Sequence, residues 1–276
     1  MGIPKSKNGE MPFLDHLEEL RWRIIYALGA ALIGLGVGFF LALHYDVIGF
    51  LAGPIIHGKN AAGHPLLPDS SLVFTHPSDG FTITLNAAMT LGLVLASPVI
   101  IYQVWAFLSP ALHRHEKRVG IGVLAAGLVL FLSGAALAFF VVIPLALPWL
   151  MGFAPPSLRP LITAEDYFGF VLAMVLTFGV SFELPIVVLA LSALGIVTPQ
   201  FLSKYRRHAV VLIVIIGAFL TPGDMVYTTI LLAVPLYALY ELSVLAAVVI
   251  SRRRERRRKQ RDAEIDQEYD GPRALA

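Results

Sequence analysis

Uncharged apolar segments long enough to cross a membrane recur along this chain of 276 residues, and they constrain its fold more than any other feature. A helix needs about 20 mainly apolar residues to cross a hydrocarbon layer of about 30 Å. Strands of a membrane barrel would alternate apolar and polar residues, and these segments do not. Charged residues make up only 14% of the chain, against about a quarter in soluble domains. The sequence therefore predicts an all-α integral membrane protein.

Six segments are candidates for transmembrane helices. We expect them at residues 24–43, within 80–112 (centred on 86–105), at 119–144, within 167–200, at 209–222 and at 225–250. Residues 1–250 would then form one membrane domain. Residues 251–276, which begin with the arginine-rich run SRRRERRRKQR, would form a charged, disordered tail that binds anionic lipid and not nucleic acid.

Lysine and arginine predict the orientation of these spans. Of the 21 such residues, all but Lys59 and Arg159 lie in the N-terminal segment, in the connections 109–118 and 198–208, or in the tail. Six spans place this majority on one side of the membrane, which the positive-inside bias identifies as the cytoplasm. Both termini are therefore expected to be cytoplasmic, in a multi-pass protein of the plasma membrane.

The fourth segment, residues 167–200, could be one long helix or a hairpin of two short ones. One helix would extend about 51 Å at 1.5 Å per residue. A hairpin would place the basic residues of the next connection outside, so we predict a single crossing. It should bend at Pro185, whose ring clashes with the carbonyl of Ser181 and removes a helical hydrogen bond.

Two carboxylates fall inside predicted spans, Glu183 and Glu241. A charge at the middle of the bilayer costs about 2.5–3.5 kcal/mol on insertion scales, so such a group should face protein or water. Glu183 could be a neutral acid bonded to a neighbouring helix, could lie closer to the surface, or could form a polar docking or relay site. Glu241 poses the same question, since it could also lie near the cytoplasmic edge.

Two further features concern helix packing and length. Gly34 and Gly38 form a GxxxG motif, which indicates that another helix can approach closely. Residues 209–222 give only about 21 Å of helix, so they would thin the bilayer unless flanking residues such as His208 extend the helix. In the external connection 44–80, the stretch DVIGFLAGPIIHG is typical of a helix in the membrane interface.

Catalytic signatures are missing from the sequence. The stretch HRHE lacks the second histidine of HExxH, and neither GxSxG nor GxxxxGK[ST] occurs. Without cysteine the chain forms no disulfide and has no thiol chemistry. We therefore expect no enzyme activity, no metal site and no cofactor.

Acidic residues on the cytoplasmic side oppose the bias toward positive charge. FLDHLEELRWR places Asp15, Glu18 and Glu19 before the first span, and YQVWAFLSPALHRHEKR places Glu116 in the next cytoplasmic connection. Alone, these acids read as ordinary helix-end charges paired with nearby arginine or lysine. They occur, however, together with FGVSFELP and LTPGD, in an order and spacing that resemble the TatC family of twin-arginine protein translocases.

The resemblance implies a fold and a set of site residues. Members of that family form a concave, glove-like bundle of six transmembrane helices, of which the last two are short. Its signal-peptide patch falls on Glu19, Arg21, Phe107 and Glu116. The residue through which the family contacts single-span partners corresponds to Glu183. The aspartate of its TPxD turn corresponds to Asp224, and Pro54 matches a proline of the first external loop.

The function implied is that of a core receptor that binds twin-arginine signal peptides and recruits single-span subunits of the TatA or TatB type. Folded cargo would then cross the membrane, driven by the proton-motive force, in a homo- and hetero-oligomeric assembly. The alternative is an ion-coupled transporter of small solutes that uses Glu183 as a proton relay. Such folds usually contain an internal repeat with paired broken helices, and the sequence contains no such repeat.

Overall fold

The computed structural model describes residues 13–60, 63–67, 71–108, 117–152, 161–193, 197–220, 229–230, 233–248 and 251–252. Their regular structure is helical, with isolated bridges at Lys59–Pro65 and Val73–Thr163. The labelled elements are α1 (Phe13–His44), α2 (Val47–Ile56), α3 (Asp79–Leu108), α4 (Lys117–Leu137), the π-helical turn η3 (Ala138–Val142), α5 (Ile143–Gly152), α6 (Ala164–Ser181), α7 (Leu184–Ala193), α8 (Pro199–Lys204) and α9 (Arg206–Leu220). A further helix covers Ala233–Val248.

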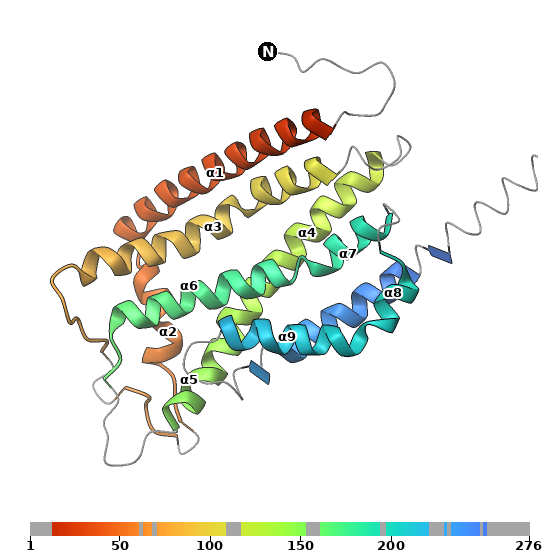
Figure 1. Ribbon diagram of the computed structural model, residues 1–276. Coiled ribbons are helices and arrows are strands. Elements are labelled where there is room, and N and C mark those ends of the chain that lie inside the picture. The colour runs from red at the N-terminus through yellow and green to blue at the C-terminus, as the bar shows by residue number, and fades with distance from the viewer. Residues whose placement is uncertain are drawn as a thin grey trace, which may run out of the picture.

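Four helical segments in the described part of the chain are long and apolar enough to cross a membrane. They are Leu17–His44, Asp79–Phe107, Ile121–Gly152 and Ala164–Ser192. These segments correspond to the first four predicted spans, and the all-α membrane fold is confirmed at this level. Figure 1 shows α1, α3 and α6 running side by side, while α4 crosses α6 at a steeper angle on its way to α5.

The closest helix packing joins α1 and α3, which run antiparallel (Figure 1). A Cβ atom on Gly34 would lie 2.4 Å from the carbonyl oxygen of Gly92, and one on Gly38 would lie 2.3 Å from that of Ala88. Contacts this short leave no room for a side chain on either glycine. The GxxxG prediction is thus confirmed, and its partner is the small-residue face of α3.

The fourth segment is a broken helix that continues in one direction, as Figure 1 shows for α6 and α7. Phe182 and Glu183 form the break. The amide of Glu183 donates to the carbonyl oxygen of Val180 at 3.1 Å, a tighter bond than the α-helical pattern. Pro185 follows directly and has no amide hydrogen to continue the ladder. The prediction of a single bent segment is confirmed, and the hairpin is not observed.

The fifth predicted span corresponds to α9, which begins at Arg206 rather than at residue 209. The flanking basic residues and His208 therefore belong to the helix, as the alternative for this segment anticipated. Even so, its 15 residues give only about 22 Å at 1.5 Å per residue. The helix Ala233–Val248 falls within the sixth predicted span and is similarly short.

The end of the bundle that carries α2 and α5 contains much of the apolar core. Leu51, Ala52 and Ile55 of α2 are buried in the same cluster as Ile143 of α5 and Val171 of α6. The hydroxyl of Tyr167 donates to the carbonyl oxygen of Leu51 at 2.8 Å. One face of α2 is therefore packed against protein, so this predicted interfacial helix is part of the core that fixes α6.

Candidate functional site

The first candidate site lies at the start of α1. The side chain of Glu19 is 13% exposed, and its Oε1 accepts a hydrogen bond from Nε of Arg23 at 3.0 Å and a second from the same guanidinium. The two residues lie one turn apart on α1, the spacing at which helix side chains face each other. Arg21 lies between them in sequence and is exposed. Glu19 is thus already held in a geometry that accepts an arginine.

Phe107 is carried to the same end by the packing of α1 on α3. The glycine contacts set an antiparallel register in which Gly34 faces Gly92 and Gly38 faces Ala88. Continued toward the start of α1, this register puts Glu19 at the same level along the helix pair as Phe107, which is half-buried. The structure therefore brings three of the four predicted signal-binding residues to one end of the α1–α3 pair.

The remaining member of the set, Glu116, lies outside the described residues. Its neighbour Lys117 begins α4, and Figure 1 shows that α4 begins at the same end of the bundle as α1. Asp224 also lies outside the described residues, so its predicted turn has no counterpart here.

The second candidate site surrounds Glu183, at the break between α6 and α7. Its Oε2 lies 3.3 Å from the position that a Cβ on Gly127 of α4 would occupy, and Ile101 and Ile186 approach the same point. Oε1 is buried and receives no hydrogen bond from the described residues. A buried acceptor without a donor costs about 1–3 kcal/mol. The carboxyl group can therefore gain free energy from a polar group supplied by another chain.

Glu241 has partners, unlike the buried oxygen of Glu183. Its Oε2 lies 3.2 Å from the guanidinium of Arg206, and its Oε1 accepts from the hydroxyl of Tyr237 at 2.9 Å. Because Arg206 is the first residue of α9, the pair joins that helix to Ala233–Val248 at the end where α8 lies. This placement favours the interpretation of Glu241 as an acid near the membrane edge.

Pro54 lies inside α2, next to the buried residue Ile55. It has no amide hydrogen, so it cannot donate to the carbonyl of Phe50. Its own carbonyl oxygen lies 2.5 Å from the position of a Cβ on Gly58, where the chain turns away from the helix. The proline thus helps to shape the end of α2, at the opposite end of the bundle from Glu19 (Figure 1).

Two residues that matter for these sites were missed from the sequence. Gly92 leaves the space into which α1 packs. The signal that could have identified it is the recurrence of small residues every four positions, at Ala88, Gly92 and Ala96. Asp79 is 1% exposed, and its Oδ2 accepts from the amides of Thr75 at 2.6 Å and His76 at 2.9 Å. An acid at the start of a long apolar run, just after Ser78, is a typical sign of a helix start.

Comparisons with known proteins identify relatives of this chain in sequence and in structure. The family model for "Sec-independent protein translocase protein (TatC)" matches residues 15–235. The TatC protein of Aquifex aeolicus is 37% identical over 251 residues, which cover 90% of this chain and all of that protein. The TatC protein of Escherichia coli K12 is 36% identical over 240 residues, 87% of this chain and 89% of that one.

The fold is similar as well. A crystal structure of the twin-arginine translocase receptor TatC superposes with a TM-score of 0.73 at 37% identity and covers 86% of this chain and 99% of that one. A second crystal structure of that receptor, in the detergent DDM, gives a TM-score of 0.72. Sequence and structure together place the chain in the TatC family of Sec-independent protein translocase proteins.

Proposed function

We propose that this protein is the core receptor subunit of a twin-arginine translocase in the plasma membrane. The observation that carries the proposal is that the half-buried Glu19 and Phe107 lie at the same end of the α1–α3 pair. Arg23 already occupies Glu19 with two hydrogen bonds, which is the kind of contact that an arginine of a signal peptide would make. The family is one of translocase subunits and not of enzymes.

In this proposal the arginine pair of a signal peptide binds at the cytoplasmic end of the bundle. Glu19 and Glu116 accept the two guanidinium groups, and Phe107 packs against the apolar part of the peptide. Folded cargo that carries the signal then crosses the membrane, driven by the proton-motive force. Arg21, the remaining residue of this patch, is exposed next to these groups.

Single-span subunits of the TatA or TatB type would bind at Glu183. The buried Oε1 supports this role, because a polar group on a partner helix would supply the missing hydrogen bond. Recruitment of such subunits makes the working unit a hetero-oligomer, with more than one copy of this chain.

The proposed topology has six spans and cytoplasmic termini, with α9 and Ala233–Val248 as the fifth and sixth. The arrangement in Figure 1 supports this topology, because the start of α1, the end of α3, the start of α4 and α8 all lie at one end of the bundle. These are the parts of the chain that carry or adjoin most of its lysine and arginine.

Cysteine labelling should confirm this topology, and the natural chain offers a background without cysteine. Single cysteines at Lys204 and in the tail should react with impermeant reagents only from the cytoplasmic face. Those at His64 or Arg159 should react only from outside. Labelling of the Lys204 position from outside would overturn the six-span arrangement.

Glu183→Ala should weaken recruitment of single-span partners while leaving signal-peptide binding largely intact. A hydrogen bond between membrane helices contributes about 0.6–2 kcal/mol, so the yield of partner should fall roughly three- to thirtyfold. Glu183→Gln, which still donates and accepts, should be milder. The measurement is the amount of single-span protein that co-purifies with the tagged full-length chain.

The matched control is Glu165→Ala, which removes an exposed acid from the first turn of the same α6. It should not change the yield of partner. If no single-span protein co-purifies with the wild type, the proposed function is contradicted. Equal yields from wild type and Glu183→Ala would instead remove only the role of Glu183.

A further inference from the structure

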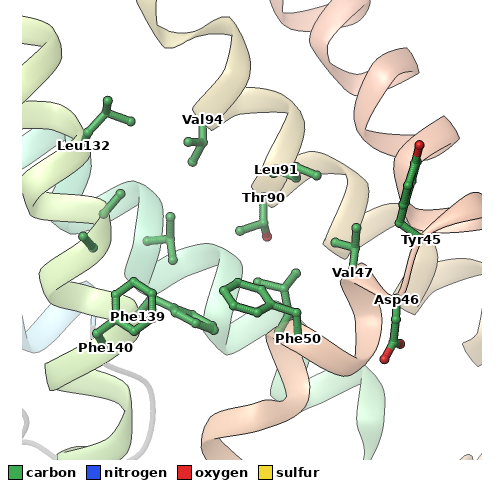
Figure 2. A pocket seen from close by; sticks show the side chains of 14 residues that line it. Tyr45, Asp46, Val47, Phe50, Thr90, Leu91, Val94, Leu132, Phe139 and Phe140 are labelled. Carbon is green, nitrogen blue, oxygen red and sulfur yellow. The ribbon is translucent and has the colours of Figure 1, made fainter.

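An apolar groove of about 470 Å³ opens between α2, α3 and the end of α4. Figure 2 shows its walls, with Phe50 from α2, Leu91 and Val94 from α3, and Leu132 and Phe139 from the segment that joins α4 to η3. Tyr45 and Asp46 lie at its rim, where α1 ends and α2 begins. The groove is separate from Glu19 and from Glu183.

The shape of the groove depends on the π-helical turn. Pro144 has no amide hydrogen, so it cannot donate to the carbonyl of Phe140. The amide of the preceding residue, Ile143, donates to the carbonyl of Ala138 five residues back, which is the π-helical pattern. The rings of two consecutive residues in this wider turn, Phe139 and Phe140, line the groove. Phe139 stacks on Phe50 with centroids 5.0 Å apart and meets Phe140 edge-on at 5.0 Å. Single π-helical turns of this kind are frequent at functional sites.

The lining lacks open hydrogen-bonding groups below the rim. The hydroxyl of Thr90 is already bonded to the carbonyl oxygen of Asn86 at 2.8 Å. At the rim, Oδ1 of Asp46 caps α2 by accepting from the amide of Gly49 at 3.0 Å, and the carboxylate is otherwise exposed. The groove therefore combines an apolar interior with one acidic group at its mouth.

The possible occupants differ in width. A partner helix is about 11 Å wide and would cover the open side of the groove with one face rather than enter it. A hydrocarbon chain is thinner and can enter the groove between its aromatic and aliphatic walls. The volume is also within the range of about 300–1,000 Å³ that is typical of small-molecule sites.

We propose that this groove binds one acyl chain of an outer-leaflet phospholipid whose headgroup carries an ammonium, such as phosphatidylethanolamine. The acyl chain lies between Phe50, Leu91 and Phe139, and the ammonium lies against the carboxylate of Asp46. The assignment of the leaflet rests on the topology proposed above, whereas the groove and its acidic rim do not.

Photo-crosslinking of the full chain in nanodiscs tests this site. A photoreactive benzoylphenylalanine is placed at Leu91 in the groove, or at Ile33, which is 71% exposed on α1 and lies at a similar depth by the antiparallel register. The discs contain equal amounts of phosphatidylethanolamine and phosphatidylglycerol. Mass spectrometry then gives the ratio of the two lipids among the adducts formed at each position.

We expect the ratio of phosphatidylethanolamine to phosphatidylglycerol to be about two- to fivefold higher at Leu91 than at Ile33, the range of an exposed ion pair. Asp46→Asn, which still caps α2, should lower the ratio at Leu91 to that at Ile33. Ala136→Leu, at an exposed position on the wall of the groove, should reduce all lipid adducts at Leu91 and leave those at Ile33 unchanged.

Equal ratios at the two positions in the wild type would overturn the headgroup assignment. Adducts to protein instead of lipid at Leu91 would overturn the acyl-chain assignment and favour a partner helix. An Ala136→Leu chain that keeps its helical circular dichroism and its full lipid adducts at Leu91 would also contradict the proposal. None of these results bears on binding of signal peptides at Glu19.

Discussion

Gly34→Leu should destabilise the protein by about 2–3 kcal/mol or more, because the new side chain has no space between α1 and α3. Its Cβ alone would lie 2.4 Å from the carbonyl oxygen of Gly92 and 3.0 Å from Cβ of Ala96. The nearest of these atoms belongs to the backbone, so no side-chain rotation relieves the contact. The two helices would have to separate along their whole interface.

Gly36→Leu is the matched control on the same helix. A Cβ at Gly36 meets nothing within 4 Å, and the position is exposed. Both substitutions put leucine in place of glycine in α1 and so change helix propensity equally. Thermal unfolding of the purified chain should therefore show a large loss for Gly34→Leu and little change, or a gain, for Gly36→Leu. Equal melting temperatures for the two variants would contradict the close packing of α1 on α3.

The same packing links stability to function. Because α1 and α3 pack through Gly34 and Gly92, Glu19 and Phe107 are held in a fixed register about four helical turns away. A Gly34→Leu chain that remains folded should still lose much of its affinity for signal peptides. Gly36→Leu should keep that affinity.

The first four helices could be predicted from the sequence, because each depends on a long apolar run and on nothing outside that run. The break before Pro185 was predictable for the same reason, since a missing amide hydrogen is a local property. The start of α9 was predicted at residue 209, with an extension by flanking residues such as His208 left open. The structure extends it to Arg206, which pairs with Glu241 on another helix.

The features that sequence reasoning could not supply all depend on two segments at once. The register of α1 on α3 requires knowing which small residues face each other, and Gly34 alone does not name Gly92. The partner of Glu241 depends on how α9 packs beside Ala233–Val248. The setting of Glu183 depends on two other features of the fold: Gly127 of α4 leaves space for Oε2, and no described residue donates a hydrogen bond to Oε1.

The residues of the signal-binding patch came from the resemblance to a family and not from their spacing. In isolation, Glu19 and Arg23 are an ordinary ion pair one turn apart on a helix, which contributes about 0.3–0.5 kcal/mol. What the structure adds is the limited exposure of Glu19 and its position at the same end of the α1–α3 pair as Phe107. The second property follows from the packing of α1 on α3.

Replacing Glu19 and Glu116 together by alanine should abolish binding of a peptide that carries two consecutive arginines. Each guanidinium presents a planar fork that a carboxylate can accept with two bonds. A charge-assisted hydrogen bond contributes about 1.5–3 kcal/mol, so each single substitution should weaken binding about 10- to 150-fold. Glu18→Ala, which removes the exposed acid next to Glu19, is the control and should have little effect.

Arginine is required in this account because lysine cannot reproduce the two-bond contact. Replacing both arginines of the peptide by lysine should therefore cost the wild-type protein most of its affinity, although the charge is unchanged. Binding should also weaken as the salt concentration rises, because the patch lies at the edge of the membrane and is open to screening.

The most direct test is to measure the affinity of the protein in nanodiscs for an Arg-Arg peptide and for its Lys-Lys counterpart. The wild type should prefer Arg-Arg strongly, and the Glu19→Ala, Glu116→Ala double variant should bind both peptides equally weakly. Undiminished Arg-Arg binding by the double variant, in a chain that unfolds at the wild-type temperature, would contradict the receptor assignment.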